Sequence, residues 1–397
     1  MRGTYIDWGR GWHPRQSQGE YGRVRFLWSF LLCFMLFIGL VPRGLLYAKS
    51  SNPYLLLVSF YSNELKEFSP EKGALLNHSP YNGVAIPLIG AYDAGQYTDK
   101  DFQPALNKLS KSIRPHVWPW IFWNRAIGLE PGKNAPHHNY RNNKAYFSRI
   151  KGIDLYNRSG ALDDFYNLYR ISLRSARKLG SPGIVVDLEP YNNHALYDIA
   201  VVAKKAGRSE TEVRKRLNDI GATLADIAHE EYPAATVWFL LTGLTDREGQ
   251  GSPVSDPGFT SIAYLVSGML ERTKATHSSL TIVEGGERSA GYCYASLDHM
   301  KKRLDSRDKA HERLLSRYPN LALGGTIAPW NATKKNWLLE GTCANSAVTT
   351  LRDFRPLFSH LFGKYKYVWI YAAEEASYDP YDPNLAEAYN QAIADAR

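Results

Sequence analysis

Residues 183–191 read GIVVDLEPY, a short β-branched run that ends in two carboxylates two positions apart. In a β-strand this spacing places Asp187 and Glu189 on one face, and it places Ile184 and Val186 on the other. The strand is apolar enough for a protein interior, so it delivers two acids at its C-terminal end, where parallel α/β folds place their chemistry. The structural alternative is a salt-bridged pair, or a helix N-cap just past the strand.

Seven further apolar runs have the length and composition of strands. They lie at Leu55 to Phe60, Gly83 to Gly90, His116 to Asn124, Thr236 to Leu244, Leu280 to Glu287, Leu321 to Pro329 and Tyr367 to Glu375. Segments of helical composition separate most of them, at Asp101 to Ile113, Ala161 to Leu179, Glu210 to Glu231, Ser296 to Tyr318 and Val348 to Phe362, with a closing segment at Asn384 to Ala396. Alternating strands and helices with eight strands predict an α/β fold, a parallel (β/α)₈ TIM barrel over residues 50–397.

The main competing architecture is a doubly wound open sheet. That fold is expected to carry a glycine-rich phosphate turn after an early strand. The sequence contains neither GxGxxG nor GxxxxGK[ST]. The barrel is therefore favoured, and no cofactor is expected.

The first 49 residues differ in character from the rest of the chain. Residues 1–25 form a basic tail, and the apolar run FLWSFLLCFMLFIGLV follows at residues 26–41. This run is shorter than the roughly 20 residues of a full membrane span. We expect residues 26–48 to be a cleaved signal peptide or an uncleaved membrane anchor, with the barrel exported to the periplasm or the cell exterior. The formal charge of +9 gathers largely in the tail, so it does not indicate a nucleic-acid partner.

The C-terminal ends of the predicted strands meet at one end of the barrel, here called the mouth. Besides Asp187 and Glu189, the candidate catalytic acids there are Glu284 and Glu287. The intervening Gly285-Gly286 breaks strand geometry, so only one of these two glutamates is expected to point inward. The candidate substrate-binding residues at the same strand ends are Trp123, Asn124, Tyr191, Trp330, Trp369, Tyr371 and Glu374.

Carboxylates gathered at one mouth are the groups that hydrolysis of a glycosidic bond needs. One carboxylic acid protonates the leaving oxygen, and a second carboxylate, or a group on the sugar, meets the oxocarbenium-like carbon. The aromatic content of 13%, with 26 Tyr and 10 Trp, suits a surface that stacks on sugar rings. The adjacent His137 and His138 are not expected to bind a metal, because no HExxH motif or second cluster accompanies them.

The stretch at 183–191 resembles the fourth-strand motif of TIM-barrel glycoside hydrolases. It is most similar to the D-x-E tail of the chitinase-type family 18 pattern, D-G-x-D-x-D-x-E, although Val185 stands where that family has a further aspartate. The resemblance implies that Glu189 is the general acid and that Asp187 orients the reacting group of the substrate. The strand from Tyr367 to Tyr371 more loosely resembles those of uncharacterised exported bacterial barrels.

The function expected from these observations is that of a glycoside hydrolase acting on a polysaccharide or glycan. Glu189 is the expected proton donor, Asp187 its partner, and Glu284 or Glu287 the second acid. Two alternatives stay open. One is a catalytically silent barrel that binds carbohydrate through the same mouth, and the other is a metal-dependent barrel enzyme, which would need a histidine clustered with two acids.

We predict that residues 50–397 lie outside the cytoplasm, because a basic tail before an apolar run is retained on the cytoplasmic side. Protease added to intact spheroplasts that express the full-length protein should therefore digest the barrel. A cytoplasmic marker protein in the same cells should stay intact, which controls for lysis. Complete protection of the barrel would reverse the predicted topology.

Overall fold

The computed structural model describes residues 53–59, 62, 64–90, 96–123, 155–156, 160–189, 196, 198–246, 253–255, 260–287, 294–329, 351–372 and 378–397. All of them belong to one unit of the chain, Ser50–Arg397. The predictions made for Asn124, Tyr191, Trp330, Glu374 and residues 26–48 lie outside the described residues. None of the helices in the described part of the chain combines the length and the apolarity that a bilayer span requires.

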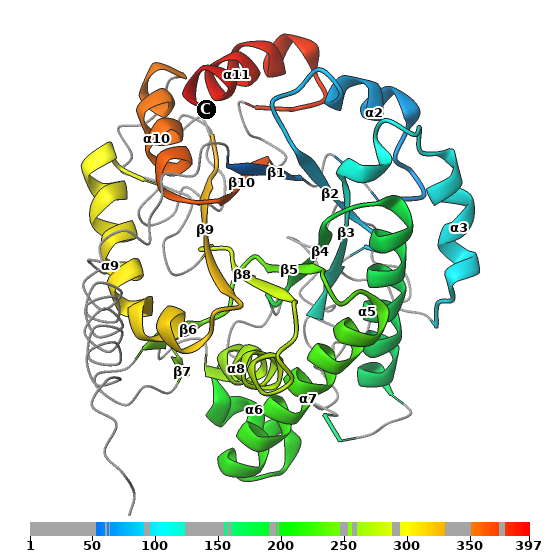
Figure 1. Cartoon of the computed structure of the whole chain (residues 1–397), viewed down its shortest axis with the longest axis vertical. Coiled ribbons are helices and arrows are strands. Elements are labelled where there is room, and N and C mark those ends of the chain that lie inside the picture. The colour runs from blue at the N-terminus through cyan, green and yellow to red at the C-terminus, as the bar shows by residue number, and fades with distance from the viewer. Residues whose placement is uncertain are drawn as a thin grey trace, which may run out of the picture. The chain divides into compact units, whose positions relative to one another are not determined.

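Eight parallel strands close into a barrel, as the sequence predicts (Figure 1). In chain order they are β1 (Tyr54–Ser59), β2 (Gly83–Pro87), β3 (Val117–Phe122), β4 (Gly183–Asp187), β5 (Thr236–Phe239), β8 (Thr281–Glu284), β9 (Leu321–Ile327) and β10 (Tyr367–Ala372). The first strand pairs with β2 on one side and with β10 on the other, which closes the sheet. Seven of the eight predicted runs contain their strand whole, and the run at Leu55 to Phe60 begins one residue after β1 does.

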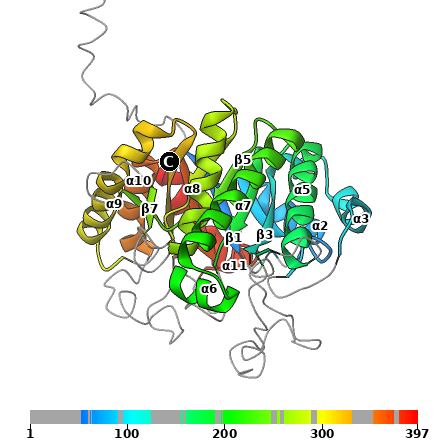
Figure 2. The same ribbon diagram turned by 90° about the horizontal axis from the view of Figure 1, so that it is seen from below.

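Helices surround the barrel (Figures 1 and 2). They are α2 (Pro70–Leu76), α3 (Asp99–Lys108), α5 (Ala161–Leu179), α6 (Ile199–Ala206), α7 (Glu210–Glu231), α8 (Thr260–Ala275), α9 (Leu297–Arg317), α10 (Leu351–Lys364) and α11 (Pro383–Ala396), with the 3₁₀ helix η3 (Arg114–His116) before β3. The sequence did not predict α2, α6 or α8, nor the antiparallel hairpin of β6 (Leu244–Asp246) and β7 (Pro253–Ser255). Helix α8 packs against α7 and buries most of its residues, so it lacks the polar face that marks an amphipathic helix.

Local signals in the sequence fix where the long helices begin and end. Helix α7 begins with a capping box, in which the Glu212 N–H donates to the Ser209 Oγ at 3.3 Å and the Ser209 N–H donates to the Glu212 carboxylate at 2.9 Å. Helix α5 ends at Leu179, and its C-terminal cap is Gly180, whose φ of 76° lies in the left-handed region that glycine adopts without strain. These local signals therefore fix where α7 begins and where α5 ends.

Alternate strand residues fill the barrel interior, and large aromatic side chains dominate it. Trp118 packs edge-on against Trp238 with ring centroids 5.7 Å apart, and Trp238 packs against Tyr367 at 5.4 Å. Trp120 and Trp369 belong to the same interior cluster and are 1% exposed. The other strand face packs against the helices and forms the larger apolar core. The interior is therefore a packed core, and ligand chemistry is left to its ends.

We predict that Gly183→Ala destabilises the barrel strongly, because a Cβ at this position would lie 1.8 Å from the Thr236 carbonyl oxygen on the next strand. The strand would have to shift, which costs about 1–3 kcal/mol or more. Gly363→Ala is the matched control, since nothing lies within 4 Å of its added Cβ in helix α10. Thermal unfolding should show a lower Tm for the first variant and an equal or higher Tm for the second. Equal Tm values for both would contradict the packing described here.

Candidate active site

Asp187 is the last residue of β4 and faces the barrel interior. Val185 belongs to the interior cluster and Val186 to the outer core, so alternation places Asp187 inside. The side chain is buried, with 1% exposed. Among the strand residues that the structure describes, it is the only charged one that alternation places inside the barrel.

Glu189 lies two residues beyond Asp187, just past the end of β4. The intervening Leu188 is fully buried in the outer core, whereas Glu189 is half-buried. Its backbone N–H donates to the Asp187 Oδ1 at 2.8 Å. The two acids are therefore linked by a hydrogen bond, with Asp187 deeper and Glu189 nearer to solvent.

An aromatic ring lies directly beside Asp187 on the neighbouring strand. Phe122 on β3 is the register partner of Asp187, and its ring centroid is 4.8 Å from that of Trp120. Tyr371 also belongs to the interior cluster, above Trp369 on β10, and is 8% exposed. Phe122 is not among the residues predicted for the site, although the alternation of Trp118, Trp120 and Phe122 signals it.

Two aromatic candidates occupy core positions. Trp123 belongs to the outer core, is 2% exposed, and packs edge-on against Phe165 of α5 with centroids 5.0 Å apart. It lies on the side of the strand opposite to Phe122, so the expected role in substrate binding is corrected to core packing. Trp369 does face the interior as expected, but it is buried and its Nε1 donates to the Gly285 carbonyl at 2.8 Å.

Glu284 faces away from the barrel interior, which corrects its assignment as a candidate catalytic acid. The preceding Val283 belongs to the interior cluster, so alternation directs Glu284 toward helix α9. There its Oε2 lies 3.3 Å from the Nη1 of Arg307, and both side chains are buried. Alternation sets this outward direction, and the buried Arg307 cation in the helical layer compensates the charge of the carboxylate there.

Arg307 is the centre of a buried network between β8, β9, α9 and α10. Its guanidinium donates to the Gly324 carbonyl and to the Asp308 Oδ1, the latter at 3.1 Å, and lies 4.7 Å from the ring centroid of Tyr365. The Tyr365 hydroxyl donates to Asp308 at 3.0 Å, and Lys364 pairs with the same carboxylate at 3.1 Å. Burial alone lowers the pKa of Arg307, but nearby oxygens, first that of Tyr365, outweigh it and raise the pKa above its ordinary value.

Glu287 is held at the end of β5. Its backbone N–H donates to the Leu240 carbonyl at 3.1 Å, and the Leu240 N–H donates to the Val186 carbonyl of β4 at 3.2 Å. The residue is half-buried, and its carboxylate oxygen Oε2 is shielded from solvent. The backbone of Glu287 is therefore linked to β4 through hydrogen bonds to a single residue, Leu240.

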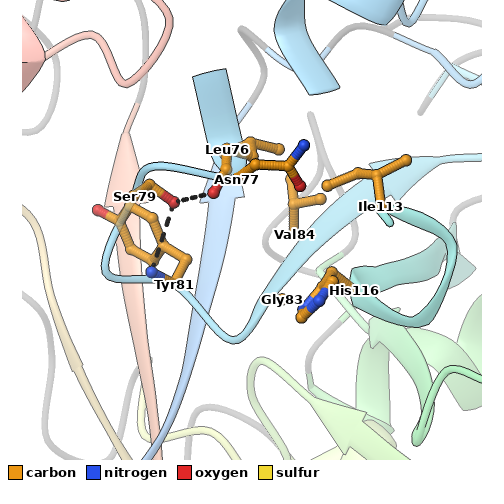
Figure 3. A pocket seen from close by; sticks show the side chains of 8 residues that line it. All are labelled: Leu76, Asn77, Ser79, Tyr81, Gly83, Val84, Ile113 and His116. Atoms are coloured by element: carbon orange, nitrogen blue, oxygen red, sulfur yellow. Dashed lines mark hydrogen bonds between the residues drawn. The ribbon is translucent and has the colours of Figure 1, made fainter. Parts of the chain in front are cut away.

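A small cavity lies beside the N-terminal ends of β2 and β3, and Figure 3 shows the residues that line it. It has a volume of about 90 Å³, and its lining includes Gly83, the first residue of β2, and His116, which immediately precedes β3. These positions are the N-terminal ends of strands, whereas Asp187 stands at a C-terminal end. No group of three His, Cys, Asp or Glu side chains suited to a metal ion occurs in the described part of the chain.

No protein-family model matches the chain, and neither does any curated protein. Solved structures that resemble it include a glycoside hydrolase family 5 enzyme from Prevotella bryantii, with 10% identity, 88% of this chain and 98% of that chain covered, and a TM-score of 0.46. A family 18 chitinase from Pseudoalteromonas aurantia has 11% identity, covers 87% and 100% of the two chains, and has a TM-score of 0.40. A sugar phosphate isomerase/epimerase from Parabacteroides distasonis has 11% identity, 86% and 96% coverage, and a TM-score of 0.38. Similarity at this level does not extend to activity, and the barrel is defined by the strand pairing of this chain.

We predict that Arg307→Met destabilises the protein by about 3–5 kcal/mol, because it leaves the buried carboxylate of Glu284 without its cation. Arg355→Met is the control, since Arg355 pairs with Asp395 at the surface and such pairs contribute under about 1 kcal/mol. Equilibrium urea unfolding, followed by tryptophan fluorescence, measures both. Equal midpoints for the two variants would show that the buried network does not hold α9 to the barrel.

Proposed function

We propose that this protein is a glycoside hydrolase whose proton donor is Glu189, with Asp187 as its partner, at the C-terminal end of β4. The observation that carries the proposal is the placement of Asp187, a buried acid that faces an interior built mainly from apolar and aromatic side chains. Burying a carboxylate is costly, so buried acids mark either a structural ion pair or a functional site. Asp187 stands at the barrel end where (β/α)₈ enzymes carry their active sites.

The depths of the two acids support different roles for them. Glu189 is half-buried and nearer to solvent, so a proton that it gives to a leaving glycosidic oxygen can be replaced from water. Asp187 is deeper and accepts the Glu189 N–H, so it fixes the backbone that carries the donor. Glu189 is therefore assigned as the proton donor and Asp187 as the group that orients it or the substrate.

The substrate class is inferred from the aromatic residues beside the acids. Phe122 neighbours Asp187 across the β3–β4 ladder, and Tyr371 ends the inward row of β10. Flat aromatic rings stack on the apolar faces of sugars, and the phenol of Tyr371 adds a polar group. A glycan chain is the substrate class that uses both kinds of contact. With the predicted signal or anchor segment at residues 26–48, the proposal is for an exported enzyme that meets glycans outside the cytoplasm.

We predict that Glu189→Gln lowers kcat on the order of 10²-fold or more on a natural glycan, because the amide cannot donate the proton. Folding should be unchanged, since Glu189 is half-buried and its backbone N–H still reaches Asp187. Glu230→Gln, an exposed glutamate in the last turn of α7, is the matched control and should keep wild-type turnover. Full-length proteins are compared on a panel of natural glycans and activated aryl glycosides.

Three outcomes of this panel would contradict the proposal. If Glu189→Gln keeps wild-type turnover on natural glycans and on aryl glycosides alike, the donor assignment is wrong. If the wild type binds a glycan but turns over none, the protein is a silent carbohydrate-binding barrel. If turnover disappears with a chelator and returns with added metal ions, the metal-dependent alternative holds.

A further inference from the structure

The turn that follows β8 is fixed by hydrogen bonds on two sides. On the side of β5, the Gly285 N–H donates to the Phe239 carbonyl at 2.8 Å and the Glu287 N–H donates to the Leu240 carbonyl at 3.1 Å. From the barrel interior, the Trp369 Nε1 donates to the Gly285 carbonyl at 2.8 Å. The backbone that leads to Glu287 therefore has little freedom.

The two glycines of this turn are required by its geometry. A Cβ on Gly285 would lie 2.5 Å from the Phe239 carbonyl oxygen, so a side chain does not fit there. Gly286 has a φ of 87°, in the region that favours glycine. The glycine pair thus lets the chain lie close against the end of β5.

The Glu284 carboxylate ties this turn to the helical layer. Its Oε1 accepts the Gly286 N–H at 3.1 Å, and its Oε2 lies 3.3 Å from the Arg307 Nη1. Arg307 is immobilised by the Gly324 carbonyl and Asp308. The buried Glu284 carboxylate, which faces the helical layer, therefore holds the Gly286 peptide in the middle of the turn that leads to Glu287.

The same turn places Glu287 in relation to Asp187. Leu240 accepts the Glu287 N–H and donates its own N–H to Val186, the residue before Asp187. Glu287 is therefore separated from β4 by one intervening strand, which corresponds to a backbone distance of about 10 Å at the usual strand spacing. Glycosidases hold their two carboxyl groups roughly 5–9.5 Å apart, and acidic side chains that extend toward each other from backbones about 10 Å apart reach that range.

We propose that Glu287 is the second carboxylate of the site and that Glu284, held by Arg307, is a positioning residue that fixes Glu287 at the mouth. This inference rests on the proposed glycoside hydrolase function. Glu284 does not touch the substrate, and it acts only through the Gly286 peptide. Its contribution is to hold Glu287 within the small tolerance that a reacting group requires.

The test removes the anchor without leaving a buried charge. The double variant Glu284→Met/Arg307→Met replaces the ion pair by apolar side chains of similar length, an exchange that is often neutral for stability. Asp308 keeps Lys364 and the Tyr365 hydroxyl as partners. Hydrogen–deuterium exchange of the full-length protein should show faster exchange at the amides of residues 285–287, with the protection of β4 and β5 unchanged.

Kinetics on a glycan that the wild type turns over give the second readout. The double variant should lose kcat on the order of 10- to 10²-fold, as misplacement of a reacting group does, with a smaller change in KM. Glu284→Gln keeps an acceptor for the Gly286 N–H and should retain most of kcat. Adding Glu287→Gln to the double variant should cost less than Glu287→Gln alone, because both changes act on one group. Glu271→Gln, an ion-paired glutamate of α8 without a contact to the turn, is the matched control.

Each result decides a separate claim. Unchanged exchange at residues 285–287 in the double variant would overturn the positioning role, whatever the activity. Faster exchange with wild-type kcat would overturn the catalytic importance of Glu287. A wild-type kcat in the Glu287→Gln variant would also overturn the catalytic importance of Glu287. If the wild type turns over no glycan, the proposed function fails and the catalytic role of Glu287 with it, while exchange still shows whether Glu284 holds the turn.

Discussion

The alternation of side chains along the eight closed strands is the constraint on which the rest of this structure depends. Each strand residue faces either the interior or the helical layer, because closure of the barrel leaves no third environment. Among the described residues, four tryptophans occupy the interior, and Asp187 ends the inward row of β4. A shift of β4 by one residue would exchange Asp187 for Val186 and leave the mouth without this acid.

The two buried acids at strand ends, Asp187 and Glu284, lie in different environments. Glu284 lies in the helical layer beside the buried guanidinium of Arg307, an arrangement typical of a structural ion pair. Asp187 lies on the inward face, among aromatic side chains and next to the half-buried Glu189. The direction in which the carboxylate faces, rather than its burial, separates the structural role of Glu284 from the catalytic role proposed for Asp187.

The barrel could be predicted because its strands are apolar runs of the right length, separated by periodic helices. The inward direction of Asp187 was also predictable, since three aliphatic residues of β4 and its extension mark the opposite face. Glu284 and Trp123 were assigned wrongly for the same reason. Neighbouring residues of a strand face opposite sides, so an error of one position reverses the face assigned to a side chain. The cation that explains Glu284, Arg307, is distant in sequence, and no local pattern joins the two.

A crystal structure of the full-length Glu189→Gln variant with a bound glycan tests the central claim most directly. The account predicts that a glycosidic oxygen lies within hydrogen-bond reach of the residue 189 side chain, about 2.6–3.2 Å, with the sugar against Phe122 or Tyr371. A glycan bound at any other face of the protein would contradict it. So would a glycan at the mouth whose glycosidic oxygens all lie beyond the reach of residue 189.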